Sequence, residues 1–180
     1  MRARALHEEN SLKAKNYREV KGQPYTRKEY AKSSPPSKIV KFTMGDPKSE
    51  FPIKAKLISL ENAQVRHNAL EAARIASNRH LSLKLGENYY LRIMPYPHMI
   101  LRENKMIFGA HADRLQDGMR GAFGKPIGTA ARVKTNQPII VVGVDEDSIE
   151  VAKQALKRSK AKLPMPCRIA IEKTRVGPGD

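Results

Sequence analysis

The sequence contains no tryptophan and a single cysteine, Cys167, so no disulfide can form within the chain. Without a second cysteine or a cluster of cysteine and histidine residues, we expect no zinc or other metal site. No window approaches the ~20 apolar residues of a membrane span, and the first residues lack the apolar run of a signal peptide. These absences predict a soluble chain that stays in the reducing cytoplasm and has no membrane partner.

Carboxylates are also scarce, because 18 Asp and Glu residues stand against 34 Lys and Arg residues. The formal net charge is +16, and such self-repulsion favours a polyanionic partner. The excess is concentrated in residues 1–60, with 14 basic and 6 acidic side chains, and in residues 102–135, with 7 and 3. An anionic membrane would be the competing polyanion, but no basic amphipathic helix with bulky apolar anchors is evident. The charge therefore favours nucleic acid.

Residues 1–37 are charged, poor in large aliphatic side chains and closed by the run Ser33-Ser34-Pro35-Pro36. Such an extension becomes ordered on a partner rather than on a core of its own. Tyrosines alternate with cations in it, and rings can stack on exposed bases while cations meet phosphates. The alternative is that the tyrosines, Tyr30 among them, attach the extension to the domain surface. The residues predicted to bind RNA here are Arg2, Arg4, Lys13, Lys15, Tyr17, Arg18, Lys21, Tyr25, Arg27 and Lys28.

The pattern from residue 38 to 101 predicts strands at 38–43, 53–60, 89–94 and 99–101. Between the second and third strands it predicts a helix that Asn62 caps and Gly86 ends. The apolar positions of that helix are Val65, Ala69, Ala72, Ala73 and Ala76. Arg66 and Arg74 are left for its other faces, and we expect both to bind RNA.

The pattern after residue 128 predicts strands at 129–133, 139–144 and 168–171. Asp145 or Asp147 is expected to cap a second helix, which carries Ile149, Ala152, Ala155 and Leu156. The predicted fold class is α+β, with two helices packed on a curved antiparallel or mixed sheet. We expect one domain over 38–175, with an internal loop at about 102–126 and a loose tail at 176–180.

The segment 102–126 is the most informative, because it combines closely spaced glycines with fixed positive charge. Glycines allow backbone to approach a ligand closely, and arginine grips phosphates or stacks on bases. A loop this long within a domain is usually functional or disordered. The predicted RNA-binding residues around it are Arg102, Lys105, Arg120, Lys125 and Arg132.

Catalytic interpretations of this segment fail on residue identity. A phosphate-binding loop of the GxxxxGK[ST] kind is excluded, because Met119 and Pro126 occupy two of its required positions. Cys167 is most simply a small core residue. We therefore expect no enzyme, no cofactor and no small-molecule substrate. An RNA-acting enzyme that uses His111 and Asp113 remains as an alternative.

The runs RIMPYPHMILRENKM and GAHADRLQDGMRGAFGKPIGTAARV, within residues 92–133, resemble the universal large-subunit ribosomal protein sixteen family. Within that family the similarity is to the archaeal and eukaryotic branch, known as ten-e. The segment ADRLQDGMRGAFGKP, residues 112–126, is the most specific part. The resemblance extends over nearly the whole chain, including the basic, tyrosine-containing N-terminus.

This resemblance implies an α/β sandwich of the hammerhead type and a place in the large ribosomal subunit. The implied partners are large-subunit rRNA, nearby 5S rRNA and A-site tRNA, and neighbouring large-subunit proteins. The internal loop would reach toward the peptidyl transferase centre and support tRNA accommodation, while Arg102, Lys105, Arg120 and Lys125 hold rRNA at its base. The implied tRNA-proximal residues are Phe108, Gly109, Ala110, His111, Ala112, Asp113, Arg114, Leu115, Gln116, Asp117 and Gly118. A freestanding tRNA- or RNA-binding module remains the alternative.

Overall fold

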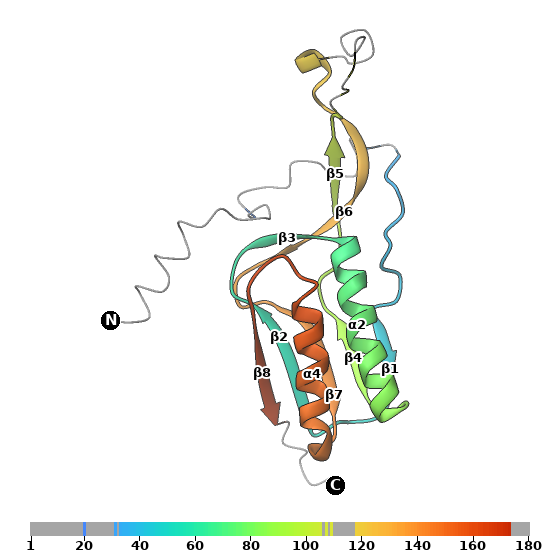
Figure 1. Cartoon of the computed structure of the whole chain (residues 1–180), viewed down its shortest axis with the longest axis vertical. Coiled ribbons are helices and arrows are strands. Elements are labelled where there is room, and N and C mark those ends of the chain that lie inside the picture. The colour runs from blue at the N-terminus through green and yellow to red at the C-terminus, as the bar shows by residue number, and fades with distance from the viewer. Residues whose placement is uncertain are drawn as a thin grey trace, which may run out of the picture.

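The computed structural model describes residues 20, 31, 33–105, 107, 109 and 118–173. These residues form two antiparallel sheets and two long helices (Figure 1). In chain order the elements are β1 (Thr43–Gly45), β2 (Ile53–Ser59), β3 (Ala63–Arg66), α2 (His67–Leu85), β4 (Tyr90–Ile93), β5 (Met99–Glu103), the 3₁₀ turn η2 (Gly118–Gly121), β6 (Lys125–Val133), β7 (Pro138–Val144), the 3₁₀ turn η3 (Glu146–Ser148), α4 (Ile149–Lys160) and β8 (Cys167–Lys173).

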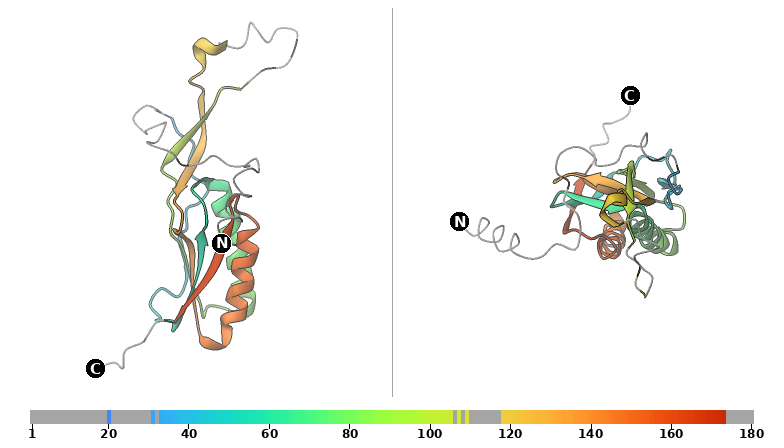
Figure 2. Two further views of the ribbon diagram at one scale, coloured as in Figure 1. Left: turned by 90° about the vertical axis from the view of Figure 1, so that its left-hand side faces the viewer. Right: turned by 90° about the horizontal axis from the view of Figure 1, so that it is seen from above.

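One sheet has five strands in the order β1-β4-β7-β2-β8, and the other has three in the order β3-β6-β5. Every strand pairing in both sheets is antiparallel. The helices α2 and α4 lie side by side on one face of the five-stranded sheet (Figure 2). The predicted α+β class is confirmed. Of the antiparallel and mixed sheets that the prediction allowed, the described strands form antiparallel sheets.

The core lies between the two helices and the five-stranded sheet. Strand β7 is its centre, because β7 pairs with β2 on one side and with β4 on the other. Ile140, Val142 and Val144 alternate along β7, so they share one face of the sheet, and all three are fully buried, as the continuous aliphatic run predicted. Each such side chain contributes roughly 1.5–3 kcal/mol relative to an exposed one.

The two helices approach each other over small residues, among them Ala73, Ala152 and Ala155, which are fully buried. Ser159 of α4 donates a hydrogen bond to the backbone oxygen of Ala73 in α2, at 3.0 Å. Small side chains at a contact shorten the distance between helix axes. Ser159 therefore finds an acceptor on the neighbouring helix although it is fully buried.

The predicted start of the first helix is wrong. Residues 63–66 are strand β3, which pairs with residues 130–133 of β6, and α2 begins only at His67. Ala63 and Val65 are buried, whereas Gln64 and Arg66 are not, which is the alternation of a strand rather than of a helix. Asn62 caps nothing, because its Oδ1 accepts hydrogen bonds from the backbone N–H and the hydroxyl of Thr135. The predicted end at Gly86 is confirmed.

Two further predictions are corrected. Of the strand expected at 38–43, only Thr43 belongs to β1. The Lys38 N–H is donated to the His67 side chain instead of a neighbouring strand. The second helix, α4, begins at Ile149 after the turn η3, and neither aspartate caps it. The Asp145 carboxylate instead accepts a hydrogen bond from Asn88 Nδ2 at 2.7 Å.

The other strands agree with their predicted positions to within a few residues, except β6, which begins four residues early, at Lys125. Cys167 is buried at the start of β8, as a core residue should be. Burial raises the pKa of its thiol to about 11. Among the described residues, no helix is both long and apolar enough to cross a membrane.

Candidate nucleic-acid interface

Strands β5 and β6 extend beyond the helices as an arm, with η2 near its far end (Figures 1 and 2). We call β5, β6 and the described residues between them the arm. The second half of β6 anchors the arm, because Ala131 and Val133 are fully buried in the core. The first half of β6 pairs only with β5, through Glu103↔Lys125 and the positions that follow. One strand thus belongs to the core at one end and to the arm at the other.

His67, at the first position of α2, joins three segments where the arm leaves the domain. Its Nδ1 accepts the backbone N–H of Lys38 at 3.2 Å and lies 3.2 Å from the Thr129 hydroxyl. A Cβ at Gly128 would come within 3.1 Å of His67 Nε2, so the backbone of β6 passes directly over the ring. Burial, and then the charges of Arg66 and Lys38, lowers the pKa of His67. The neutral imidazole therefore connects the 33–45 segment, α2 and β6.

Arg102 and Phe123 join the two sides of the arm at the point where its strand pairing ends. The Arg102 guanidinium lies 3.3 Å from the centre of the Phe123 ring and donates a hydrogen bond to the Phe123 backbone oxygen. Gly124 follows with a φ of +71°, and a Cβ there would lie 2.7 Å from the Glu103 carbonyl carbon. Only glycine fits such a position without strain. The glycine pattern predicted close backbone approach, and at Gly124 it occurs within the chain itself.

The arm presents positive charge to solvent. Lys105, Arg120 and Lys125 are exposed, and Glu103 is the only carboxylate among the described residues of the arm. Met119 is 90% exposed and Phe123 is 60% exposed. An exposed surface that combines cations with large apolar side chains suits RNA, where phosphates and base faces lie side by side.

Arg66 and Arg132 lie together near the root of the arm. Strands β3 and β6 pair Gln64 with Arg132 and Arg66 with Ala130, so both arginines occupy the same face of the three-stranded sheet. Such diagonal positions lie about 7–8 Å apart. Arg66 is exposed and Arg132 is half-buried. The pairing therefore groups two arginines that are 66 positions apart in sequence.

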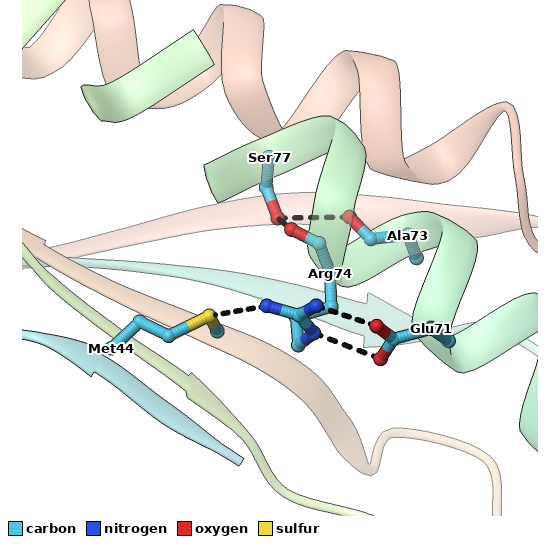
Figure 3. Close-up of polar contacts among 5 residues, drawn as sticks. All are labelled: Met44, Glu71, Ala73, Arg74 and Ser77. Atoms are coloured by element: carbon cyan, nitrogen blue, oxygen red, sulfur yellow. Dashed lines mark hydrogen bonds and ion pairs between the residues drawn. The ribbon is translucent and has the colours of Figure 1, made fainter. Parts of the chain in front are cut away.

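The Arg74 side chain is bound by other residues of the protein. Its Nε and Nη2 donate to the two carboxylate oxygens of Glu71, at 2.8 and 2.5 Å, and its Nη1 contacts Met44 Sδ at 2.9 Å (Figure 3). The hydrogen bonds from Arg74 lower the pKa of Glu71, and the same bonds raise that of Arg74. Only 16% of the Arg74 side chain is exposed. Arg74 thus connects α2 to β1 and is poorly placed to bind RNA.

Many of the predicted contact residues lie outside the described part of the chain. They are Arg2, Arg4, Lys13, Lys15, Tyr17, Arg18, Lys21, Tyr25, Arg27 and Lys28 of the N-terminal extension, and Phe108, Ala110, His111, Ala112, Asp113, Arg114, Leu115, Gln116 and Asp117 of the internal loop. Gly109 and Gly118 of that loop are described, and both have positive φ, +147° and +59°. Within the described ranges, no group of His, Cys, Asp and Glu side chains could hold a metal ion.

Negative charge gathers at the end of the molecule opposite the arm. Eight of the eleven carboxylates in the described residues lie there, in the β1–β2 and β7–α4 connections, just after α2, at the start of α4 and at the end of β8 (Figure 1). They are Asp46, Glu50, Glu87, Asp145, Glu146, Asp147, Glu150 and Glu172. Three of these carboxylates form ion pairs with lysines: Glu150 with Lys153, Glu146 with Lys173 and Glu172 with Lys56. The arm is therefore the positive end of the described molecule.

Comparisons with known proteins agree with this arrangement. The profile of the family described as ribosomal protein L16p/L10e matches residues 20–170. Three archaeal relatives are each named large ribosomal subunit protein uL16. The one from Staphylothermus marinus is 51% identical over 165 residues, which is 91% of this chain and 95% of the relative. The one from Hyperthermus butylicus is 52% identical over 151 residues, covering 83% and 84%, and the one from Methanococcus maripaludis is 48% identical over 161 residues, covering 89% and 93%.

The extent of these matches confirms the resemblance that residues 92–133 indicated. It also confirms the prediction of a ribosomal structural protein rather than an enzyme, because the matched proteins are of that kind. The chain belongs to the ribosomal protein L16p/L10e family.

Proposed function

We propose that this chain, a structural constituent of the large subunit of the cytoplasmic ribosome, binds large-subunit rRNA through the arm and the N-terminal extension. The observation that carries the proposal is the arm itself, where Lys105, Arg120 and Lys125 are exposed beside a single described carboxylate, Glu103. A positive surface of this kind neutralises phosphates and releases their counterions. Arg66 and Arg132 extend this surface to the root of the arm.

The internal loop, at about residues 102–126, is proposed to support tRNA accommodation near the peptidyl transferase centre. The family resemblance supports this role, together with a position near 5S rRNA, the A-site tRNA and neighbouring large-subunit proteins. The contacts at Arg102, Phe123 and Gly124 fix the base of the loop. The chain itself supplies architecture and charge, and bond-making is left to RNA.

Charge substitution on the arm tests the rRNA proposal. In the triple variant Lys105→Gln, Arg120→Gln and Lys125→Gln, each lost phosphate contact should reduce the log–log salt slope of binding by about 0.7–0.9 units. The matched control is Lys48→Gln, Lys54→Gln and Lys84→Gln, which removes the same charge at exposed positions toward the opposite end. Binding to protein-free large-subunit rRNA would be measured from 50 to 400 mM salt. Equal salt slopes for the two triple variants would show that the arm does not bind rRNA phosphates.

Sedimentation of a cell lysate through sucrose at low and high salt tests assembly. Co-sedimentation with large subunits that survives moderate salt supports a built-in constituent. A chain that stays at the top of the gradient in both salts would favour a freestanding RNA-binding module. Arg114→Ala tests the tRNA role, since wild-type assembly and translation rates in that variant would count against it.

A further inference from the structure

Three aromatic rings lie in a row at the connection between β4 and β5, one pair stacked and the other tilted. Phe42 and Tyr96 lie with ring centroids 5.3 Å apart and planes inclined by 26°. The ring of His98 follows, with its centroid 4.7 Å from that of Tyr96 and the planes inclined by 49°. We call Phe42, Tyr96 and His98 the aromatic stack. None of its members belongs to the arm.

The inner and outer ends of the aromatic stack differ in their surroundings. Phe42 is half-buried and packs against the hydrophobic core. Tyr96 is 53% exposed, and His98 is exposed as well. A ring that serves only to fill the core would be covered, so the outer two rings offer apolar surface that the described protein does not use.

The backbone holds the outer rings in place. Pro95 and Pro97 stand on either side of Tyr96, and both are buried. Their rings fix φ, and the His98 N–H is donated to the Tyr96 carbonyl at 3.0 Å. Because the rings are already ordered, a ligand that stacks on them loses little conformational entropy of the protein.

The charged side chains on the two segments that carry the aromatic stack are all basic. The segments 33–45 and 88–102, which carry the three rings, contain no carboxylate. Lys41 directly precedes Phe42, and Arg92 is the cross-strand partner of Thr43; both cations are exposed. Exposed rings on segments whose only charges are positive fit a ligand that has both a flat apolar face and a negative charge.

We propose that the aromatic stack is a second RNA site, at which an unpaired base stacks on the exposed surface of Tyr96, beside the tilted ring of His98. The exposed cations of the same two segments, Lys41 and Arg92, attract the phosphates of that RNA strand. The site rests on the proposed function, and it adds a place for base stacking outside the arm. A partner protein could also cover exposed rings, but the absence of carboxylates in both segments and the stacked pair Phe42–Tyr96 favour a nucleotide.

Photochemical crosslinking locates the site. The full chain is bound to protein-free large-subunit rRNA, irradiated at 254 nm and digested with ribonuclease and trypsin. Tyr96 and His98 lie on one peptide, residues 93–102, because Arg92 and Arg102 are the flanking cleavage points. The expected result is a nucleotide adduct on this peptide, which Tyr96→Phe retains and the double variant Tyr96→Ala and His98→Ala loses.

Affinity measurements separate stacking from charge and from general apolar contact. Loss of one stacked base typically weakens binding by about tenfold, so Tyr96→Ala should bind rRNA about tenfold less tightly at an unchanged salt slope. Tyr96→Phe should bind like wild type. The control Val40→Ser removes a neighbouring aliphatic side chain that is 78% exposed and should also leave binding unchanged.

Three other outcomes of these experiments would contradict the inference. Adducts on arm peptides such as 121–132 but none on 93–102, with Tyr96→Ala binding normally, would leave the arm proposal intact and remove the stacking site. Loss of a co-purifying large-subunit protein in Tyr96→Ala, with rRNA affinity unchanged, would assign the rings to a protein partner. An absence of adducts on any peptide, together with binding that does not depend on salt, would overturn the proposed function and the inference with it.

Discussion

Replacing Gly124 by alanine should open the base of the loop, where the strand pairing of the arm ends, while leaving the rest of the fold intact. Gly124 has a φ of +71°, a region that costs an L-residue roughly 1–2 kcal/mol. The added Cβ would also lie 2.7 Å from the Glu103 carbonyl carbon and 2.8 Å from the Asn104 nitrogen. Both are backbone atoms, so no side chain can rotate away to relieve the contact. The pairing of Glu103 with Lys125 should therefore be lost.

Amide hydrogen exchange measures this effect locally. A loss of 1–2 kcal/mol corresponds to about 5–30-fold faster exchange for amides that open locally. We expect this acceleration, as a lower bound, at residues 99–103 and 125–128, and no change in β7. Gly118→Ala is the matched control, because Gly118 also has a positive φ, +59°, but nothing lies within 4 Å of the added Cβ. If Gly124→Ala left the arm as protected as in wild type, the argument from backbone contact would be refuted.

Three more predictions concern the contacts that hold the arm and the helices. Phe123→Ala removes the ring beneath the Arg102 guanidinium, worth about 0.5–1 kcal/mol at an exposed site, so trypsin should cut the arm two- to fivefold faster; an unchanged rate would contradict this. Glu71→Gln weakens the half-buried ion pair with Arg74, so the free energy of urea unfolding should fall by about 1 kcal/mol. An increase would mean that the desolvation of the two charges exceeds their attraction. Burial lowers the pKa of His67 in the folded state, so its contribution to stability is present above the unfolded-state pKa of about 6.5 and is lost as the pH falls below it. Urea midpoints at pH 7.5 and 5.5 should differ less in His67→Gln than in wild type; an equal difference would exclude this histidine as a cause.

The sequence predicts correctly those helices and strands that neighbouring residues alone specify. The aliphatic run of β7 and the apolar spacing of α4 need only neighbouring residues to be recognised. β3 was missed because Asn62 stands before a helix-like pattern, and only the pairing with β6, almost 70 residues away, makes residues 63–66 a strand. The intrinsic preference of a short segment yields to such non-local pairing.

The same contrast between local sequence patterns and non-local contacts applies to the candidate site. Charge and glycine content singled out the arm, because a functional loop differs in composition from a core. The position of Arg74 could not be predicted, since helix periodicity placed it on an outer face that β1 then covers. His67 carried no signal, because its partners, Lys38 and Thr129, are brought to it only by the tertiary fold.

The separation of charge along the long axis gives the described molecule an electric dipole moment. In the field of a polyanion, a body of this kind experiences a torque that turns its positive end forward before any contact is made. Encounters with RNA should therefore begin with the arm, and fewer collisions are lost to wrong orientations. Added salt shortens the range of this alignment to about 8 Å at physiological strength, so the rate of association should fall with salt more steeply than net charge alone would require.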